Sequence, residues 1–392
     1  MAKTFRRGPI YEEDLALNSG SGAATASRGT STGGSQTLTK LGAGSAWFLS
    51  RLNNIFFVDG VKYATIQAAL TAADAAGGGT VFLPIGTYNI TAALTWTTNS
   101  INLVGASRNE TIIQMVDATN NLNGIVPGGT SRIAHLTLKG TNGTGAGDGI
   151  TNGPIDGLVL DDIEVLNWPG HGINSGAGST NWSGGNLYIH DNKKDGLLYG
   201  QATGGTFSNI FAYSNGANGI DLGGSSFVTL NGCLAYSNGG SGATGLDQDG
   251  ILIYSDSVVG NAVGNIISGC IARNNNTHGI RLQAGTGGQV RENILIGNNA
   301  YQNGVGDGAT QNGDGIILLN DSTNGQMLRN TVLGNIVSTN YRHGVFVSST
   351  AGAGAFNRTL VTDNQVFTNG ARGIYVGHSN SADTLIKNNI TL

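Results

Sequence analysis

The stretch Asn275-Asn276-Thr277-His278-Gly279-Ile280-Arg281-Leu282 contains the pattern that decides the fold. A polar residue, a glycine and an aliphatic residue open a short segment in which apolar and variable residues alternate. This triplet, which we call a station, occurs ten times, at Asn123-Gly124-Ile125, Asp148-Gly149-Ile150, His171-Gly172-Ile173, Asp195-Gly196-Leu197, Asn218-Gly219-Ile220, Asp249-Gly250-Ile251, His278-Gly279-Ile280, Asp314-Gly315-Ile316, His343-Gly344-Val345 and Arg372-Gly373-Ile374. Successive station glycines are 25, 23, 24, 23, 31, 29, 36, 29 and 29 residues apart. Self-similarity on this scale predicts stacked structural repeats.

Asparagines form a second periodic position. They stand four residues before the station glycine at Asn192, Asn215, Asn275, Asn340 and Asn369, and twelve residues before it at Asn238 and Asn303. Asparagine tolerates left-handed backbone and bonds neighbouring main-chain groups. Stacked amides can also bond along a column, as they do in cross-β structures. We therefore predict an asparagine ladder running along a rod.

Five residues before these asparagines lies another column, made of Cys233, Cys270, Asn298, Asn335 and Asn364. The two cysteines fall in neighbouring coils and are predicted to point inward. Buried free thiols are the expected state, and a stacked disulfide is the alternative.

Composition limits the class of protein. Of 392 residues, 65 are Gly and 5 are Pro, and we expect glycine where tight turns need positive φ. Hydrophobic residues make up 39% and charged residues 11%, which predicts a buried core. The net charge of −4, without a basic cluster, argues against nucleic-acid binding. No apolar run approaches the ~20 residues of a membrane span, so no membrane contact is expected.

Residues 1–45 are rich in Gly, Ser, Thr and Ala and predict a flexible arm. One interpretation is an anchor that attaches the protein to a virion or a partner protein, and the other is a plain flexible tail. The start of the sequence is positively charged without a following apolar region, so we expect no Sec signal peptide. The expected location is a virion, or the outside of a cell after lysis.

Residues 46–118 predict an N-terminal cap and the first coils. Ile66, Leu70 and Ala73 share one face of a predicted helix, which ends at the glycines of residues 77–79. Short strands are predicted at residues 80–84, 86–90, 101–105 and 111–115. The repeats themselves occupy residues 119–392.

Residues 61–70 (Val-Lys-Tyr-Ala-Thr-Ile-Gln-Ala-Ala-Leu), followed by Gly-Gly-Gly-Thr-Val-Phe-Leu-Pro and Gly-Thr-Tyr, resemble the N-terminal cap of pectate-lyase-like proteins. The resemblance covers about residues 55–392. It implies an all-β fold, a right-handed single-stranded parallel β-helix with a short capping helix, and phage tailspikes share that fold. The superfamily includes lyases, hydrolases, epimerases and binding proteins, so the resemblance leaves the activity open.

Two functions therefore stay open. The first is a tailspike- or fibre-like virion protein that binds a cell-surface polysaccharide, with a homotrimer as an expected assembly. The second is a polysaccharide lyase or glycoside hydrolase that acts on an extracellular acidic glycan.

A candidate active site lies where the station spacing is interrupted. Residues 239–249 and 304–314 are long turns of equal length that flank a short turn ending at His278. We predict a cleft with His278 on its floor and Arg281 beside it, and with Asp249 and Asp314 about 9.5 Å apart. That separation is at the upper edge of the ~6.5–9.5 Å of inverting glycosidases. Otherwise, the polar station residues are interpreted as exposed turn positions.

Two alternatives concern the same turns. No cofactor is required for either function, but Asp247 and Asp307 could join Asp249 and Asp314 in binding Ca²⁺. The long turns could equally be insertions, which repeat folds tolerate in their loops.

A candidate binding surface lies two residues before the asparagine ladder. That position is expected to be exposed and carries His190, Tyr213, Tyr236, Arg273, Tyr301, Ser338 and Phe367. Aromatic rings spaced by coil suit stacking on sugar rings. The alternative is the ordinary preference of aromatic residues for strands.

Overall fold

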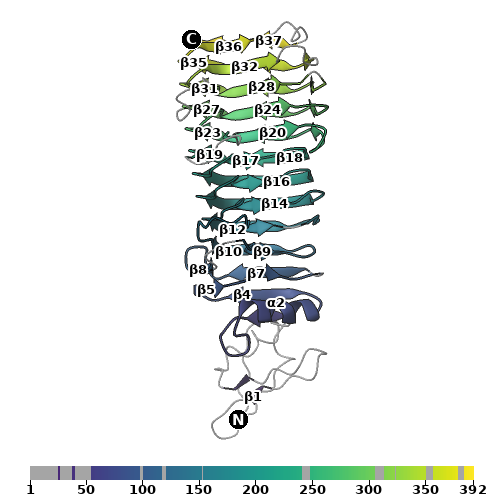
Figure 1. Ribbon diagram of the computed structural model, residues 1–392, viewed down its shortest axis with the longest axis vertical. Coiled ribbons are helices and arrows are strands. Elements are labelled where there is room, and N and C mark those ends of the chain that lie inside the picture. Colours follow the sequence, from purple (N-terminus) through teal and green to yellow (C-terminus); the bar gives the residue numbers. More distant parts are fainter. Residues whose placement is uncertain are drawn as a thin grey trace, which may run out of the picture.

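The chain winds into a rod of parallel strands, with the N-terminal part at the base and the C-terminal strands at the top (Figure 1). The computed structural model describes residues 54–97, 100–116, 121–151, 153–240, 248–304, 313–322, 324–349, 356–377 and 384–392. It also describes the backbone of β1 (Thr25–Ala26) and β2 (Leu38–Thr39), which pair antiparallel.

The base of the rod contains the predicted helix, α2 (Ile66–Ala75), between β3 (Ile55–Phe57) and β4 (Gly79–Leu83) (Figure 1). The hydroxyl of Thr65 caps it by accepting a hydrogen bond of 3.1 Å from the main-chain N–H of Ala68. Its buried face consists of Ile66, Ala69, Leu70 and Ala73. The apolar spacing in the sequence therefore identified this helix correctly.

One side of the rod is a parallel sheet of eleven strands, and the ten stations open ten of them. We call it the station sheet. Its strands are β6 (Leu94–Thr95), β9 (Ile125–Val126), β11 (Ile150–Thr151), β13 (Ile173–Asn174), β15 (Leu197–Leu198), β17 (Ile220–Asp221), β20 (Ile251–Ser255), β24 (Ile280–Ala284), β28 (Ile316–Asn320), β32 (His343–Ser349) and β36 (Arg372–Val376). Ten steps of about 4.8 Å make this sheet roughly 50 Å long.

The other strands of the rod pair in parallel and form what we call the long sheet. In addition to β3 and β4 they are β5 (Gly86–Ile90), β7 (Ile101–Gly105), β8 (Thr111–Met115), β10 (Arg132–Lys139), β12 (Val159–Leu166), β14 (Thr180–His190), β16 (Thr203–Tyr213), β18 (Ser226–Asn231), β19 (Leu234–Tyr236), β21 (Ala262–Val263), β22 (Ile266–Ser268), β23 (Ile271–Arg273), β25 (Gln289–Arg291), β26 (Ile294–Ile296), β27 (Asn299–Tyr301), β29 (Gln326–Leu328), β30 (Thr331–Leu333), β31 (Ile336–Ser338), β33 (Phe356–Asn357), β34 (Leu360–Thr362), β35 (Gln365–Phe367), β37 (Leu385–Lys387) and β38 (Ile390–Thr391). The first strands join the repeats, because β7 and β8 both pair with β10. The cap and the coils therefore share one ladder.

The predicted asparagine ladder is present and buried. Asn275 shows its pattern: its Nδ2 donates to Asn303 Oδ1 at 3.0 Å and to the carbonyl of Ala235 at 3.1 Å, and its Oδ1 accepts from Asn238 Nδ2 at 3.0 Å. The same amide-to-amide bond joins Asn192 to Asn215, Asn215 to Asn238, Asn303 to Asn340 and Asn340 to Asn369. Each coil therefore satisfies the buried amide of the coil before it.

Two more polar columns run inside the rod. The predicted one continues from Cys270, whose main-chain N–H bonds Asn298 Oδ1 at 2.9 Å, through Asn335 and Asn364. Cys233 and Cys270 are buried free thiols, as expected. The other column, Asn265, Asn293 and Asn330, was not identified from the sequence.

Our backbone interpretation of the asparagines was wrong by one residue. The residues with positive φ directly precede the ladder, at Ser237 (54°), Asn274 (53°) and Gln302 (56°). The ladder position itself is selected for its amide, because only a side chain with both a donor and an acceptor continues the column.

The station glycines also serve a different purpose from the one expected, because none of them has positive φ. A Cβ atom at Gly250 would lie 2.6 Å from Asn275 Nδ2, and one at Gly279 would lie 2.8 Å from Asn303 Nδ2. The same clash with the next ladder amide, at 2.6–2.7 Å, occurs at Gly172, Gly196, Gly219, Gly315 and Gly344. Glycine is therefore required by the space that the next asparagine occupies.

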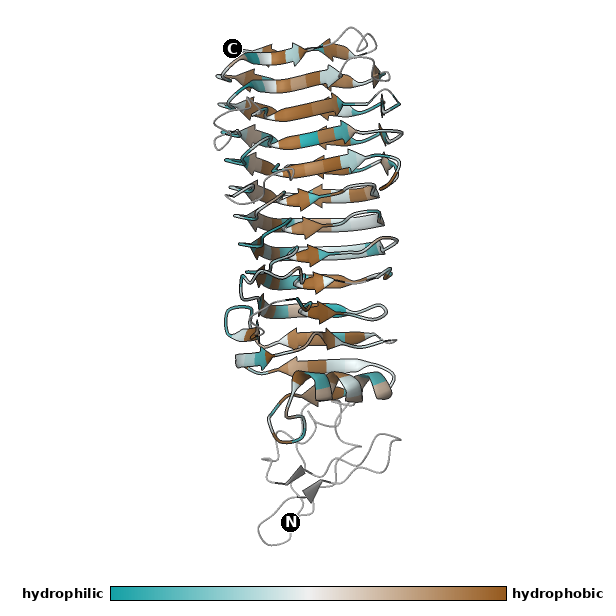
Figure 2. Ribbon diagram, in the orientation of Figure 1, coloured by the Kyte–Doolittle hydropathy of each residue, from teal (hydrophilic) through white to brown (hydrophobic). Residues whose placement is uncertain are grey.

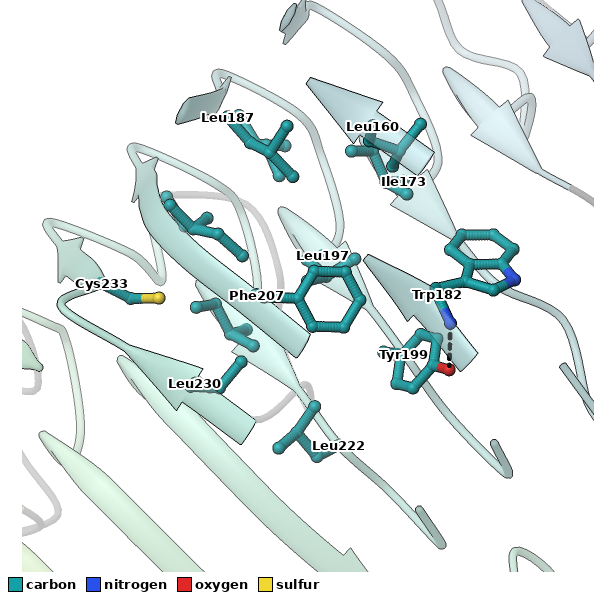
Figure 3. Packing of buried hydrophobic residues seen from close by; sticks show 14 of the residues in the cluster. Leu160, Ile173, Trp182, Leu187, Leu197, Tyr199, Phe207, Leu222, Leu230 and Cys233 are labelled. Atoms are coloured by element: carbon teal, nitrogen blue, oxygen red, sulfur yellow. Dashed lines mark hydrogen bonds between the residues drawn. The ribbon is translucent and has the colours of Figure 1, made fainter. Parts of the chain in front are cut away.

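Apolar side chains fill the interior between the two sheets, and the strands are correspondingly hydrophobic (Figure 2). Figure 3 shows Phe207 and Tyr199 among leucines of successive coils. The main-chain N–H of Trp182 donates to the Tyr199 hydroxyl at 3.4 Å (Figure 3). That hydroxyl donates in turn to the carbonyl of Gly204 at 2.5 Å. The all-β parallel β-helix predicted from the repeats is thus confirmed.

Replacing Asn275 by Ala is expected to lower the free energy of unfolding by roughly 3 kcal/mol, because buried groups of Asn238 and Asn303 lose their partner. Urea unfolding followed by circular dichroism measures the change. Asn231→Ala, at an exposed position, is the control and should stay within about 0.5 kcal/mol of the parent protein. Equal stability of the two variants would contradict the role of the ladder.

Candidate functional site

Seven of the ten polar station residues are buried, whereas Asn123 and His171 are half-buried and Arg372 is exposed, so our expectation of exposed turn positions is wrong for most of the column. Asp249 and Asp314 are fully buried, and His278 is only 5% exposed. Their side chains accept hydrogen bonds from the main chain of the next station: Asp249 Oδ1 from His278 N at 2.9 Å, His278 Nδ1 from Asp314 N at 3.2 Å, and Asp314 Oδ1 from His343 N at 3.0 Å. The station column is thus a second kind of ladder.

His278 also faces the side chain of Asp314, since its Nδ1 lies 3.4 Å from Asp314 Oδ2. Arginines face the two buried carboxylates. Arg281 Nε lies 2.7 Å from Asp249 Oδ2, and Arg342 Nε donates to Asp314 Oδ1 at 2.9 Å.

The structure therefore brings Asp249, His278, Asp314 and Arg281 together, as the sequence suggested. However, the two carboxylates have no exposed surface through which they could contact a polysaccharide. Their hydrogen bonds and ion pairs account for a structural role. Their catalytic role stays a prediction.

Asp247 and Asp307 lie outside the described residues, as do most of the two long turns. The Ca²⁺ site and the cleft therefore stay predictions. Among the residues that the structure describes, no three His, Cys, Asp or Glu side chains are grouped to hold a metal. Nor does this part of the chain contain a helix long and apolar enough to cross a membrane.

The predicted column of aromatic residues is confirmed in its register. Tyr213, Tyr236, Arg273 and Tyr301 are partners on neighbouring strands of the long sheet, and all four are partly exposed. His190 pairs with Tyr213 and starts the column, but it is buried at 7% exposure, so the expected exposure is wrong at this position.

The rings of this column stack on one another. The centroids of His190 and Tyr213 are 4.4 Å apart with planes at 9°, and those of Tyr213 and Tyr236 are 4.9 Å apart at 11°. The Arg273 guanidinium lies 4.7 Å from the centre of the Tyr236 ring. Because the ring faces cover each other, these rings present edges and hydroxyls to a ligand. The expected stacking on sugar rings is not available to them.

His190 is the centre of a cluster that the sequence analysis missed. Its Nε2 lies 3.1 Å from Glu164 Oε1, and its Nδ1 lies 2.7 Å from Asp191 Oδ2. Glu164 also accepts a hydrogen bond of 2.9 Å from Thr137 Oγ1. The register of the strands could have revealed this contact. Glu164 is the partner of Tyr188, which stands two residues before His190 on the same strand, so Glu164 lies diagonally next to His190.

A second stack lies beside the first. The Arg108 guanidinium lies 3.8 Å from the centre of the Tyr188 ring, and Tyr188 stacks on Phe211 at 4.8 Å and 8°. Arg108 Nε also bonds Asp162 Oδ1 at 3.0 Å. We call the two stacks together the stacked face; it comprises Arg108, Tyr188, Phe211, His190, Tyr213, Tyr236 and Arg273.

The protonation of the stacked face follows from its contacts. Burial lowers the pKa of His190, but the hydrogen bonds and charges of Glu164 and Asp191 outweigh burial and raise it above 6.5. The hydrogen bond from His190 lowers the pKa of Glu164 below 4.5. Burial raises the pKa of Tyr213 to about 12. The contacts of His190 thus favour its protonated form, the Tyr213 phenol is neutral near pH 7, and Arg108 and Arg273 add guanidinium groups to the face.

The carboxylates of this face are already engaged. Glu164 and Asp191 bind His190, and Asp162 binds Arg108. The face is therefore well supplied with hydrogen-bond donors, while its bases are occupied. This arrangement suits the binding of acceptor-rich molecules better than proton abstraction.

The family model for the right-handed β-helix region matches residues 123–322 and 247–391. The chain belongs to the right-handed β-helix family. This membership confirms the handedness that the resemblance implied.

Among curated proteins, the chain is 36% identical to mannuronan C5-epimerase AlgE1 of Azotobacter vinelandii over 174 residues, which are 38% of this chain and 12% of that protein. It is 31% identical over 165 residues to alginate lyase 7 of the same organism, covering 36% of this chain and 19% of that protein. The similarity thus spans a minor part of these relatives.

Among solved structures, this β-helix is similar to the A-module of the A. vinelandii mannuronan C-5 epimerase AlgE6. The TM-score is 0.63 at 25% identity, over 83% of this chain and 94% of the module. The Dettilon tailspike protein has a TM-score of 0.54 at 16% identity, over 87% and 69% of the two chains. The latter likeness shows the fold alone.

Asp314→Asn is expected to lower the free energy of unfolding by about 3 kcal/mol, because it removes the charge that faces Arg342 within a buried network. Chemical unfolding measures this loss. Asp363→Asn, at an exposed position, should change stability by less than about 0.5 kcal/mol. A fully stable Asp314→Asn protein would argue that the carboxylate is not there for structure.

Glu164→Gln is expected to lower the pKa of His190, because one of the two carboxylates that raise it is lost while burial persists. An NMR titration of the His190 ring measures the shift, and Glu110→Gln, at an exposed position, is the control.

The same pair makes stability depend on pH. A raised His190 pKa stabilises the fold below pH 6.5, and this contribution is lost as the pH rises through the raised value. A lowered Glu164 pKa stabilises it above pH 4.5, and this contribution is lost as the pH falls through the lowered value. The pair should thus contribute most between 4.5 and 6.5. An unchanged His190 pKa in Glu164→Gln would contradict the assigned contacts.

Proposed function

We propose that this β-helix protein binds an acidic polysaccharide along its stacked face. The observation that carries the proposal is the column from Tyr213 to Tyr301, which presents one polar, partly exposed side chain per coil of the long sheet. Neighbouring coils are about 4.8 Å apart, a step similar in length to one sugar ring of an extended glycan. A chain lying along the rod would meet an equivalent donor at each coil.

The donors suit a ligand rich in acceptors. The Tyr213 and Tyr236 hydroxyls lie at the edges of the stacked rings, and Arg273 adds a guanidinium that is held over Tyr236. A guanidinium presents paired N–H groups to a carboxylate. Among the described residues Arg273 has no ion-pair partner, so its charge is available to a ligand.

The comparisons support the class of ligand. The curated relatives bear the names mannuronan C5-epimerase and alginate lyase, and mannuronan and alginate are polymers of uronic acids. The AlgE6 A-module resembles this chain over most of its length. We infer that Arg273 binds the carboxylate of one sugar in such a polymer.

Catalysis on the same polymer is the second candidate function, because those relatives are enzymes. Epimerisation and β-elimination both begin by removing the proton next to the sugar carboxylate, which requires a free base. The carboxylates of the stacked face are engaged, and Tyr213 is a neutral phenol with a pKa of about 12. This chemistry favours binding over turnover at the stacked face.

We further propose that residues 1–45 attach the rod to a virion or a partner protein, with a homotrimer as the assembled form. Support comes from the Gly-, Ser- and Thr-rich composition of that segment and from the fold shared with phage tailspike structures. The protein would then be located in a virion, or outside the cell after lysis.

Binding of polymannuronate, with neutral dextran as the comparison, tests the proposal by affinity electrophoresis and calorimetry. Arg273→Gln should weaken polymannuronate binding roughly tenfold, because a charge-assisted hydrogen bond is lost. The double variant Tyr213→Phe/Tyr236→Phe keeps the rings and should lose a similar factor. Arg329→Gln, whose side chain already pairs with Glu292, should bind as the parent does.

The same samples distinguish binding from catalysis. Ultraviolet absorbance of unsaturated uronates reports elimination, and NMR of the recovered polymer reports epimerisation. Products that vanish in an Asp249→Ala or Asp314→Ala protein that circular dichroism shows to be folded would support the enzyme. Absence of polymannuronate binding, or equal affinity of Arg273→Gln and Arg329→Gln, would overturn binding at the stacked face.

A further inference from the structure

The last two strands of the station sheet carry a cluster of arginine and aromatic side chains that lies apart from the stacked face. Phe346 on β32 and Tyr375 on β36 are partners in register and point outward. Their rings stack at 5.4 Å with planes at 7°. We call the group formed by Arg342, Phe346, Arg372 and Tyr375 the arginine–aromatic patch.

An arginine guanidinium lies over each aromatic ring of the patch. The Arg342 guanidinium lies 4.7 Å from the centre of the Phe346 ring, and the Arg372 guanidinium lies 4.3 Å from the centre of the Tyr375 ring. A cation above an aromatic face is attracted by the π electrons, and stacking on the ring also fixes the orientation of the planar guanidinium group. The two guanidinium groups are therefore positioned rather than loosely solvated.

The two arginines differ in their partners. Arg342 binds the buried carboxylate of Asp314 through Nε and a terminal nitrogen. Arg372 is exposed and forms no ion pair with any residue that the structure describes. Its N–H groups are thus available to an anion from outside.

The surroundings leave the patch positive. Asp314 offsets one of the two arginine charges, and the His343 ring lies beside both aromatic rings, with its centroid 5.1 Å from that of Phe346 and 4.9 Å from that of Tyr375. Burial, together with the charges of Arg342 and Arg372, lowers the pKa of His343, although Asp314 opposes this shift. His343 is therefore neutral at pH 7, and among the described residues the charge of Arg372 has no offsetting partner.

We propose that the arginine–aromatic patch is a second binding site for the carboxylate of an acidic sugar, with Arg372 as the anion-binding group and the edge of Tyr375 beside the sugar ring. The patch belongs to the station sheet, whereas the stacked face belongs to the long sheet. One rod would thus hold two saccharide segments on different sides. Only the ligand class rests on the proposed function.

Calorimetry of the full chain with a short saturated mannuronate oligomer tests this site. The oligomer is too short to reach both sheets, so the expected stoichiometry is two per chain. Arg372→Gln should reduce it to one, or weaken the second site at least tenfold, because a charge-assisted hydrogen bond is lost. Arg372→Lys keeps the positive charge but loses the planar guanidinium, so its affinity at this site should lie between those of the parent protein and Arg372→Gln.

Controls separate this site from the stacked face. Arg358→Gln, an exposed arginine of a neighbouring coil, should bind two oligomers. Arg273→Gln should lose the other site and keep the one that depends on Arg372. The carboxyl-reduced oligomer should not bind at the patch. Thermal melting confirms that each variant is folded.

The outcomes are distinct. Binding that depends on Arg372 but not on Arg273 would support the patch and overturn the stacked face as the binding surface. Arg372→Gln with the stoichiometry and affinity of Arg358→Gln would overturn the patch. A folded parent protein that binds no oligomer would overturn both proposals.

Discussion

The contact between a station glycine and an asparagine amide of the next coil is the constraint on which this rod depends. At Gly250 a Cβ atom would lie 2.6 Å from Asn275 Nδ2, so no other residue allows that amide to reach its partners. The amide in turn bonds Asn303 and the carbonyl of Ala235. The same contact occurs at seven of the ten stations, from Gly172 to Gly344, and fixes the register of those coils, since a slip by one residue would bring a side chain into the space of an amide.

Fixed register explains why polar side chains gather in columns. A residue at a given place in one coil lies about 4.8 Å from its counterpart in the next. Inside the rod this spacing builds ladders, and outside it builds the ring stack from His190 to Arg273. The outward positions are free of the interior constraint, so chemistry can vary there without disturbing the fold.

The repeat was predictable from the sequence because glycine, asparagine and aliphatic residues recur at constant offsets. The burial of Asp249 and Asp314 was not, since a polar residue at a turn usually faces water, and only the coordinates show the next main-chain N–H bonding to it. The column of Tyr213 and Tyr236 was foreseen, but the stacking of their rings depends on side-chain rotation. Glu164 was missed because its partner His190 lies on a diagonal across strands.

The long turn between Asn238 and Asp249 is anchored at both ends. Asn238 bonds Asn275, while the main-chain N–H of Asp249 bonds Asn218 Oδ1 at 2.9 Å. The next coil connects the same two points, Asn275 and His278, with only two intervening residues. Successive coils therefore offer equivalent pairs of attachment points that accept connecting segments of different length. Replacing the segment between Asn238 and Asp249 by another would leave the hydrogen bonds of the coils in place.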